Sequence, residues 1–183
     1  MVMQGDFHKR TAGWLGSLTV LVGAVVVMGW VLGIRPMAGI IPGPVTMVIN
    51  TALSFMCLGT ALVIIHNTTE EARLHTFGRM LALLVAVVGA LTIIEYIADL
   101  DLGIDQLVHR DYFNKNLASP GRMSPITSVN FVLLGLALCL YGGRRGGLTR
   151  ILTIVAGVFT LLGIIGHLYG VTPLFSLEKS GTS

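Results

Sequence analysis

The stretch MVINTALSFMCLGTALVIIH, residues 47–66, contains no aspartate, glutamate, lysine or arginine over its whole length. A helix needs about 20 predominantly apolar residues to cross the hydrocarbon core of a bilayer. Such continuous apolar runs favour helices over the alternating pattern of membrane β-strands. The sequence therefore predicts an all-α integral membrane protein with five transmembrane helices, at residues 12–34, 45–66, 80–98, 123–143 and 151–170.

The composition points to the same class of protein. Of the 183 residues, 54% are hydrophobic and only 11% are charged, and the mean hydropathy is +0.82. A soluble domain carries about 25% charged residues, so a disordered chain, a disulfide scaffold and a typical soluble enzyme are excluded. The net charge of +3 does not indicate nucleic-acid binding, because the basic residues stand singly or in pairs beside the apolar runs.

The cysteines and the N-terminus fit a multi-span protein as well. Cys57 and Cys139 each lie inside an apolar run without the spacing of a zinc site, so we expect them to pack as small apolar residues. The first apolar run follows a polar start and is longer than the core of a cleavable signal peptide. We therefore expect a retained first span, a membrane domain over residues 1–171, and a polar tail over 172–183.

The lysines and arginines set the expected orientation, because they are enriched in cytoplasmic loops. One side of the predicted bundle holds Lys9, Arg10, Arg73, Arg79, Arg144, Arg145 and Arg150. The other side holds Arg35, Arg110, Lys115, Arg122 and Lys179, in longer segments that also carry aspartates. This distribution predicts that the N-terminus lies in the cytoplasm.

Spans two and four share the pattern M-x3-T-x3-F-x2-L-G-x-A-L, which begins at Met47 and again at Met123. Spans three and five match more weakly, starting from Arg79 and Arg150. The pattern predicts two helical hairpins in the same orientation, spans two and three and spans four and five, each entering from the outside and returning there, which is a parallel two-helix internal repeat. Many transporters instead use inverted repeats, so the repeat does not favour transport.

Four polar side chains fall in the outer third of the predicted bilayer: Asn50, Glu95, Asn130 and His167. Glu95, for example, lies 16 residues beyond Arg79, which is about 24 Å along a helix. An ionisable group within a span is costly unless it is paired or hydrated. One interpretation is an outward-opening pocket for a ligand or other stimulus; the other is that these side chains join helices or reach the interface.

Three other sites are less consistent with the sequence. Met37, Met47, Met123 and His167 lack the clustering of a Cu(I) site, and the histidines are not at the matching depths that a haem would need. The aspartates at 99, 101 and 105 alternate with apolar residues and lack the closing glutamate of a calcium loop. We expect that segment to be amphipathic and to lie on the membrane surface, and we expect no metal and no cofactor.

Four strings carry a resemblance to a known family. They are MVINTALSFMCLGTAL from Met47, IIEYIADLDLGIDQL from Ile93, PGRMSPITSVNFVLLGLAL from Pro120, and GHLYGV from Gly166. Residues 47–171 thereby resemble the membrane-embedded N-terminal sensor region of bacterial sensor histidine kinases and diguanylate cyclases. That pattern normally continues into a span that returns to the cytoplasm, and it usually has tyrosine or another residue where this chain has His167.

The resemblance implies a sensory input module without an enzymatic activity of its own, which signals to a cytoplasmic output domain in cis or in trans. The alternative is an accessory or structural subunit of a larger, energy-transducing membrane complex. Both functions imply contact with the lipid bilayer and either a homo-oligomer or a partner membrane protein. The end at Ser183 fits either a fragment of a longer receptor or a shortened protein that keeps only the sensor fold.

Overall fold

The computed structural model describes residues 2–39, 46–67, 72–108, 111–113, 119–143 and 146–169. Over these residues the chain is helical and has no strand, which confirms the all-α prediction for this part. The helices are α1 (Val2–Leu32), α2 (Arg35–Ala38), α3 (Ile49–Asn67), α4 (Ala72–Ala98), α5 (Pro125–Leu140) and α6 (Gly146–Leu168).

Four helices are long and apolar enough to cross a membrane: Arg10–Leu32 of α1, α3, α4, and Gly146–Gly166 of α6. They make the chain a membrane protein by length and composition. The shorter α5 is also apolar, but its 16 residues cover only about 24 Å. It begins at Pro125 rather than 123, because Ser124 caps it by accepting a hydrogen bond from Thr127 N at 3.2 Å.

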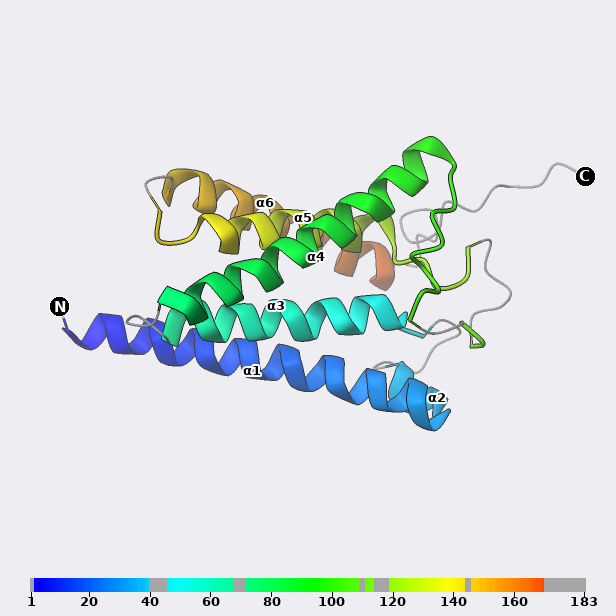
Figure 1. Cartoon of the computed structure of the whole chain (residues 1–183), viewed down its shortest axis with the longest axis horizontal. Coiled ribbons are helices and arrows are strands. Elements are labelled where there is room, and N and C mark those ends of the chain that lie inside the picture. The colour runs from blue at the N-terminus through cyan, green and yellow to red at the C-terminus, as the bar shows by residue number, and fades with distance from the viewer. Residues whose placement is uncertain are drawn as a thin grey trace, which may run out of the picture.

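The helices pack mainly with neighbours in the chain (Figure 1). Helix α1 lies along α3, and α4 packs along α5 while also contacting α3. The last helix, α6, packs against α5. Of its most apolar 18-residue stretch, only 6% of the residues are buried. Its apolar side chains therefore face outward along most of the helix.

Two pairs of helices approach each other through glycine in the same way. A Cβ at Gly23 would lie 2.6 Å from the carbonyl oxygen of Ala52, and one at Gly89 would lie 2.7 Å from that of Ser128. Likewise, a Cβ at Gly59 would meet the carbonyl oxygen of Gly16. These contacts join α1 to α3 and α4 to α5, and in both helix pairs only glycine lets the backbones come this close.

These contacts recur at constant shifts along the sequence. The α4 positions lie 66 residues after their α1 counterparts, and the α5 positions lie 76 residues after their α3 counterparts. Gly135 follows Gly59 by the same shift, and a Cβ there would lie 2.6 Å from the carbonyl oxygen of Ala82. The α1–α3 and α4–α5 pairs therefore have equivalent packing.

The ends of α1 and α4 are also alike. Trp30 Nε1 donates to the carbonyl oxygen of Met47 at 2.8 Å, and the hydroxyl of Tyr96 donates to that of Met123 at 3.1 Å. The positive φ angles of Gly33 (70°) and Asp99 (52°) end the two helices at positions 66 residues apart. The same backbone ending thus places both aromatic side chains against the start of the following helix.

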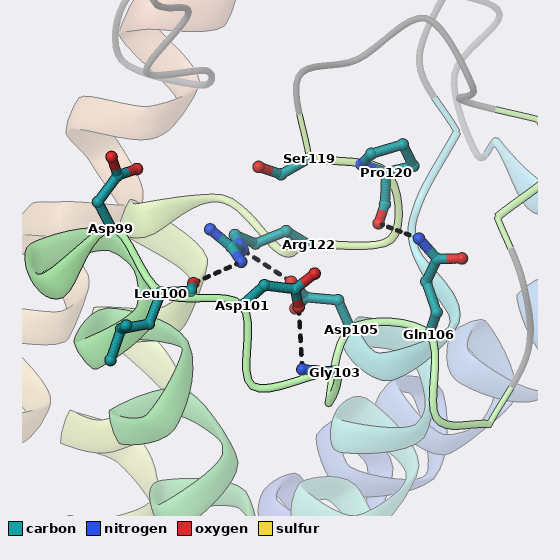
Figure 2. A pocket seen from close by; sticks show the side chains of 9 residues that line it. All are labelled: Asp99, Leu100, Asp101, Gly103, Asp105, Gln106, Ser119, Pro120 and Arg122. Carbon is teal, nitrogen blue, oxygen red and sulfur yellow. Dashed lines mark hydrogen bonds and ion pairs between the residues drawn. The ribbon is translucent and has the colours of Figure 1, made fainter.

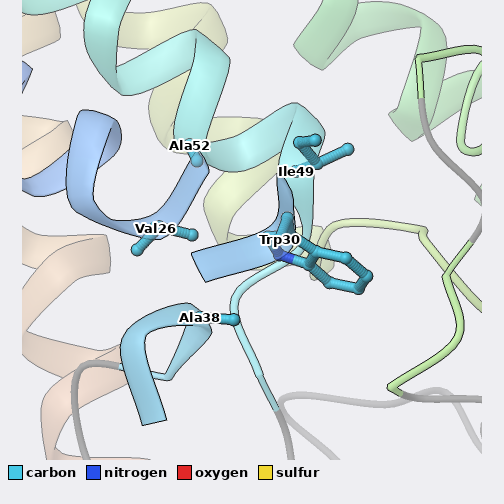
Figure 3. Close-up of a cluster of buried hydrophobic side chains, with 5 residues drawn as sticks. All are labelled: Val26, Trp30, Ala38, Ile49 and Ala52. Atoms are coloured by element: carbon cyan, nitrogen blue, oxygen red, sulfur yellow. The ribbon is translucent and has the colours of Figure 1, made fainter. Parts of the chain in front are cut away.

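Trp30 sits in a buried cluster at this end of the bundle (Figure 3). Its side chain is 1% exposed, and it packs with Val26 of α1, Ala38 of α2, and Ile49 and Ala52 of α3. A second cluster, around Phe131, joins α3, α4 and α5. These clusters hold the helix ends from which the loop residues described next project.

Candidate functional site

The candidate site lies where the segment after α4, residues 99–108, meets residues 119–124 before α5. Asn50, in the first turn of α3, fixes this segment by donating from Nδ2 to the carbonyl oxygens of Ile104 at 2.8 Å and Asp105 at 3.3 Å. The site is therefore built from the first turn of α3, the end of α4 with the segment after it, and the segment before α5.

A buried ion cluster forms its centre. Arg122 Nε donates to Asp105 Oδ2 at 2.7 Å and lies 3.6 Å from Glu95 Oε2. The side chains of Arg122, Asp105 and Glu95 are 10%, 7% and 0% exposed. Buried ions are costly to desolvate unless further hydrogen bonds satisfy them, so the remaining bonds of the cluster matter.

Backbone groups supply some of those bonds. Glu95 Oε1 accepts from the amide of Leu102 at 2.8 Å, and Arg122 donates from Nη2 to the carbonyl oxygen of Leu100 at 3.1 Å. The Arg122 guanidinium also lies 5.3 Å from the centre of the Tyr96 ring, a cation–π geometry. The cluster thus ties the end of α4 to the residues just before α5.

Two carboxylate oxygens of the cluster are left over. Glu95 Oε2 and Asp105 Oδ1 are buried and accept no hydrogen bond from the described residues. Burial raises the pKa of Asp105 above its usual range, against the opposing effect of its bond with Arg122. Asp101 adds a third, exposed carboxylate, and ligand oxygens of Glu95, Asp101 and Asp105 lie within 4.8 Å of one another.

A cavity of about 350 Å³ opens beside the cluster. Figure 2 shows Asp101, Asp105 and Arg122 converging on one side of the loop, while Asp99 points away from them. Gln106 closes another wall by donating from Nε2 to the carbonyl oxygen of Pro120 at 3.2 Å. A charged wall of this kind suits a small polar or cationic ligand.

Asp111 braces the site from the side of α1. Its carboxylate oxygens accept from the amide of Phe113 at 3.1 Å and from that of Gly121 at 2.9 Å. The neighbouring Tyr112 donates from its hydroxyl to the carbonyl oxygen of Trp30. The segment that carries Arg122 is therefore anchored to both α1 and α4.

The four residues singled out from the sequence are found in different surroundings. Asn50 and Glu95 both bond to the loop after α4. Asn130 instead donates from Nδ2 to Thr160 Oγ1 at 3.3 Å, which joins α5 to α6. His167 is in the last turn of α6, and its side chain lies outside the described part of the structure. A pocket formed by all four stays a prediction.

Sequence reasoning missed Asp105 and Arg122 as site residues. The segment from Asp99 to Asp105 was expected to lie on the membrane surface, whereas Asp105 is 5% exposed and bonded to Arg122. A further carboxylate reaches that segment from α4, because ligand oxygens of Glu95, Asp101 and Asp105 lie close together. The sequence signal was present in the strings around Asp105 and Arg122, which carry the resemblance described above.

A second cavity, of about 610 Å³, lies at the opposite end of α3 and α5. Most of its wall is apolar, with His66, Tyr141 and Arg150 among the polar lining residues. Such a lining suits hydrocarbon more than a polar ligand. Among the described residues that line it, none carries a carboxylate.

No known protein family, curated protein or solved structure matches this chain. The function of the site therefore has to be argued from its own chemistry. That chemistry is a buried, incompletely bonded set of charges beside a polar cavity, at one end of a set of membrane-spanning helices.

Proposed function

We propose that this chain is a membrane-embedded sensory input module of a bacterial signal-transduction receptor, and that its stimulus acts on the Glu95–Asp105–Arg122 cluster. In this proposal α5 is the fifth span, the N-terminus is cytoplasmic, and the cluster lies at the outer side of the inner membrane. The output domain is cytoplasmic, in cis or on a partner.

The resemblance to bacterial sensor regions supports this proposal through the residues that carry it. Glu95, Tyr96 and Asp105 come from the string that begins at Ile93, and Arg122 and Met123 come from the string that begins at Pro120. All five residues meet in one set of contacts. Residues from separate strings of the resemblance thus lie together in the fold.

The observation that carries the proposal is a comparison of the two helix pairs. We infer a parallel internal repeat whose units are α1–α3 and α4–α5, because their contacts match at constant shifts. At the same shifts, Glu95 corresponds to Gly29 and Arg122 to Thr46. At the corresponding end, the α1–α3 pair packs without these charges. The α4–α5 pair therefore does not need them merely to pack in the same way. They serve a function that the first pair lacks.

The cluster is placed to change the relation between α4 and α5. Arg122 and Glu95 bind the two helices at one end, and Gly89 and Gly135 keep their backbones in contact along the way. A ligand that binds the carboxylates of the cluster would change how firmly Arg122 holds that end. Because tightly packed helices move as rigid rods, the shift would reach the opposite end, where Arg79 bonds to the carbonyl oxygen of Tyr141.

The proposal can be tested by the receptor's output. The chain in its native receptor, or joined to a kinase reporter, is compared with Arg122→Gln and Asp105→Asn. The matched control is Arg73→Gln, which removes an exposed guanidinium from the first turn of α4. We expect the two cluster variants to lock the output and abolish its response to stimulus. A normal response in both variants would exclude the cluster as the point where the stimulus acts.

The exposed apolar face of α6 favours a second candidate function, that of an accessory subunit in a larger membrane complex. Only 6% of the residues in the most apolar 18-residue stretch of α6 are buried, so the helix offers a long surface to another membrane protein. Purification in mild detergent separates the two functions. A stable stoichiometric complex with other subunits would favour the accessory role, and a monomer or homodimer would favour the sensor.

A further inference from the structure

We propose that Glu95, Asp101 and Asp105 form a binding site for a calcium ion at the end of α4. The inference deepens the proposed function by naming the class of stimulus, and it rests on that function only for its role in signalling. Binding itself is a property of these three carboxylates and can be measured without an output domain.

The arrangement of the carboxylates fits a calcium ion. Their ligand oxygens lie within 4.8 Å of one another. Calcium binds oxygens at 2.3–2.6 Å, so two of its ligands on opposite sides are up to about 5 Å apart. Magnesium demands a near-ideal octahedron at 2.0–2.1 Å and keeps several of its waters, so a site of three carboxylates suits it less well. We therefore expect calcium to bind more tightly than magnesium.

The unused oxygens point to a ligand independently of the acidic cluster. Glu95 is fully buried, yet its Oε2 accepts no hydrogen bond from the described residues, and the same holds for Oδ1 of Asp105. A buried charged oxygen without a hydrogen bond is costly, because it has lost its water without a replacement partner. A bound cation would satisfy both atoms at once.

Arg122 does not fill this need. Its Nε–H is directed to Asp105 Oδ2 at 2.7 Å, and its Nη2 is bonded to Leu100, which leaves Glu95 Oε2 at 3.6 Å. Among these four side chains, three carboxylates stand against one guanidinium. A divalent cation would balance the remaining charge, while Arg122 keeps Asp105 oriented.

The cavity gives the ion a route to the site. It is lined by Asp101 and Asp105, and Asp101 is exposed. Asp101 is also held in place, since its Oδ1 accepts from the amide of Gly103 at 2.9 Å. The proposed site thus has one exposed carboxylate at its mouth and two buried ones behind it.

The test is titration calorimetry of calcium chloride into the purified full chain in detergent, after chelator treatment and dialysis. We expect saturable binding with a Kd on the order of 0.1–1 mM, the range of extracellular calcium modules. Magnesium should bind at least about tenfold more weakly. Calcium should also raise the Tm of the protein, and the shift should keep growing with the logarithm of the calcium concentration above the Kd.

Two neighbouring variants make the test specific. Asp101→Asn removes a ligand charge but can still accept the bond from Gly103, so the loop keeps its shape. Asp99→Asn removes an acid two residues away that is not among the three clustered carboxylates, and asparagine tolerates its positive φ of 52°. We expect Asp101→Asn to weaken binding about tenfold or more and Asp99→Asn to change it less than about twofold.

The proposal is overturned if the unmodified chain shows neither saturable heat nor a Tm shift at about 10 mM calcium, well above the expected Kd. It is equally overturned if Asp101→Asn and Asp99→Asn bind calcium alike. Either result would leave the sensor function standing with a different stimulus. Conversely, calcium binding without any calcium-dependent output would confirm the site and refute its signalling role.

Discussion

Arg122 reaches back along the chain to Asp105, with Nε donating to Oδ2 at 2.7 Å, and this bond closes the loop between α4 and α5. The same guanidinium lies 3.6 Å from Glu95 at the end of α4. One side chain therefore connects a helix end, the following loop and the start of the next helix. Its removal should affect the whole of this end of the protein.

Arg122→Gln should lower the free energy of unfolding by about 3–5 kcal/mol, the usual cost of breaking a buried ion pair from one side. The variant leaves the buried carboxylates of Glu95 and Asp105 without their cation. Unfolding by SDS in mixed micelles measures the change. Arg79→Gln, which loses only a bond to the exposed end of α5, should cost less than about 1 kcal/mol. Equal losses in the two variants would contradict the role of Arg122.

Asp105 should make the stability of the protein depend on pH. Burial raises its pKa in the folded protein above the ordinary 3.8, so the folded state binds a proton more readily than the unfolded state. This contribution to stability is fully present below pH 3.8 and is lost as the pH rises through the folded pKa. The free energy of unfolding should therefore increase on acidification in that window, by at most about 1.4 kcal/mol per pH unit.

Asp105→Asn is the control for this pH dependence. Asparagine keeps the size of the side chain but does not titrate, so the acid-side increase should disappear. The measurement is the same SDS titration repeated between weakly acidic and neutral pH. If the variant retains the full slope, then another group, and not Asp105, is responsible.

Gly135→Ala should destabilise the α4–α5 contact. The new Cβ would lie 2.6 Å from the carbonyl oxygen of Ala82, so the two backbones must separate, at a cost of about 1–3 kcal/mol. Gly157→Ala, where a Cβ meets nothing within 4 Å, should instead stabilise α6 by up to about 1 kcal/mol. Opposite signs in the unfolding free energy are the expected result.

Gly59→Ala tests the inferred repeat in the same assay. It faces the carbonyl oxygen of Gly16 at the position that corresponds to Gly135, so it should cost a similar amount. A neutral Gly59→Ala beside a costly Gly135→Ala would argue against equivalent packing of the two helix pairs.

The sequence was sufficient to predict apolar helices and to select Glu95 and Asn50 as unusual polar residues. It also matched α3 with α5, which share Phe, Leu, Gly and Ala positions, and it matched α4 more weakly with α6. The match of α1 with α4 was hidden, since equivalent contacts use different side chains, Trp30 in one and Tyr96 in the other. Equal backbone geometry does not require equal residues.

The partners of the charges could not be read from the sequence for a different reason. Asp105 and Arg122 lie in non-helical segments, and such segments have no periodicity from which to infer which side chains meet. Their contact depends on how α4 and α5 bring the two segments together. Arg122 was counted as a loop charge for orientation, whereas it is the centre of the cluster.

Asn50 lies in the first turn of α3 and Asn130 in the second turn of α5, and the two should behave differently when each is replaced by alanine. Asn50→Ala removes the bonds to the carbonyl oxygens of Ile104 and Asp105, so residues 102–106 should exchange amide hydrogen faster. Asn130→Ala removes only the bond to Thr160, so its effect should appear in α6. Hydrogen exchange followed by mass spectrometry resolves the two regions. If Asn130→Ala also speeds exchange at 102–106, the asparagines act on one shared pocket, and the separate roles argued for them are wrong.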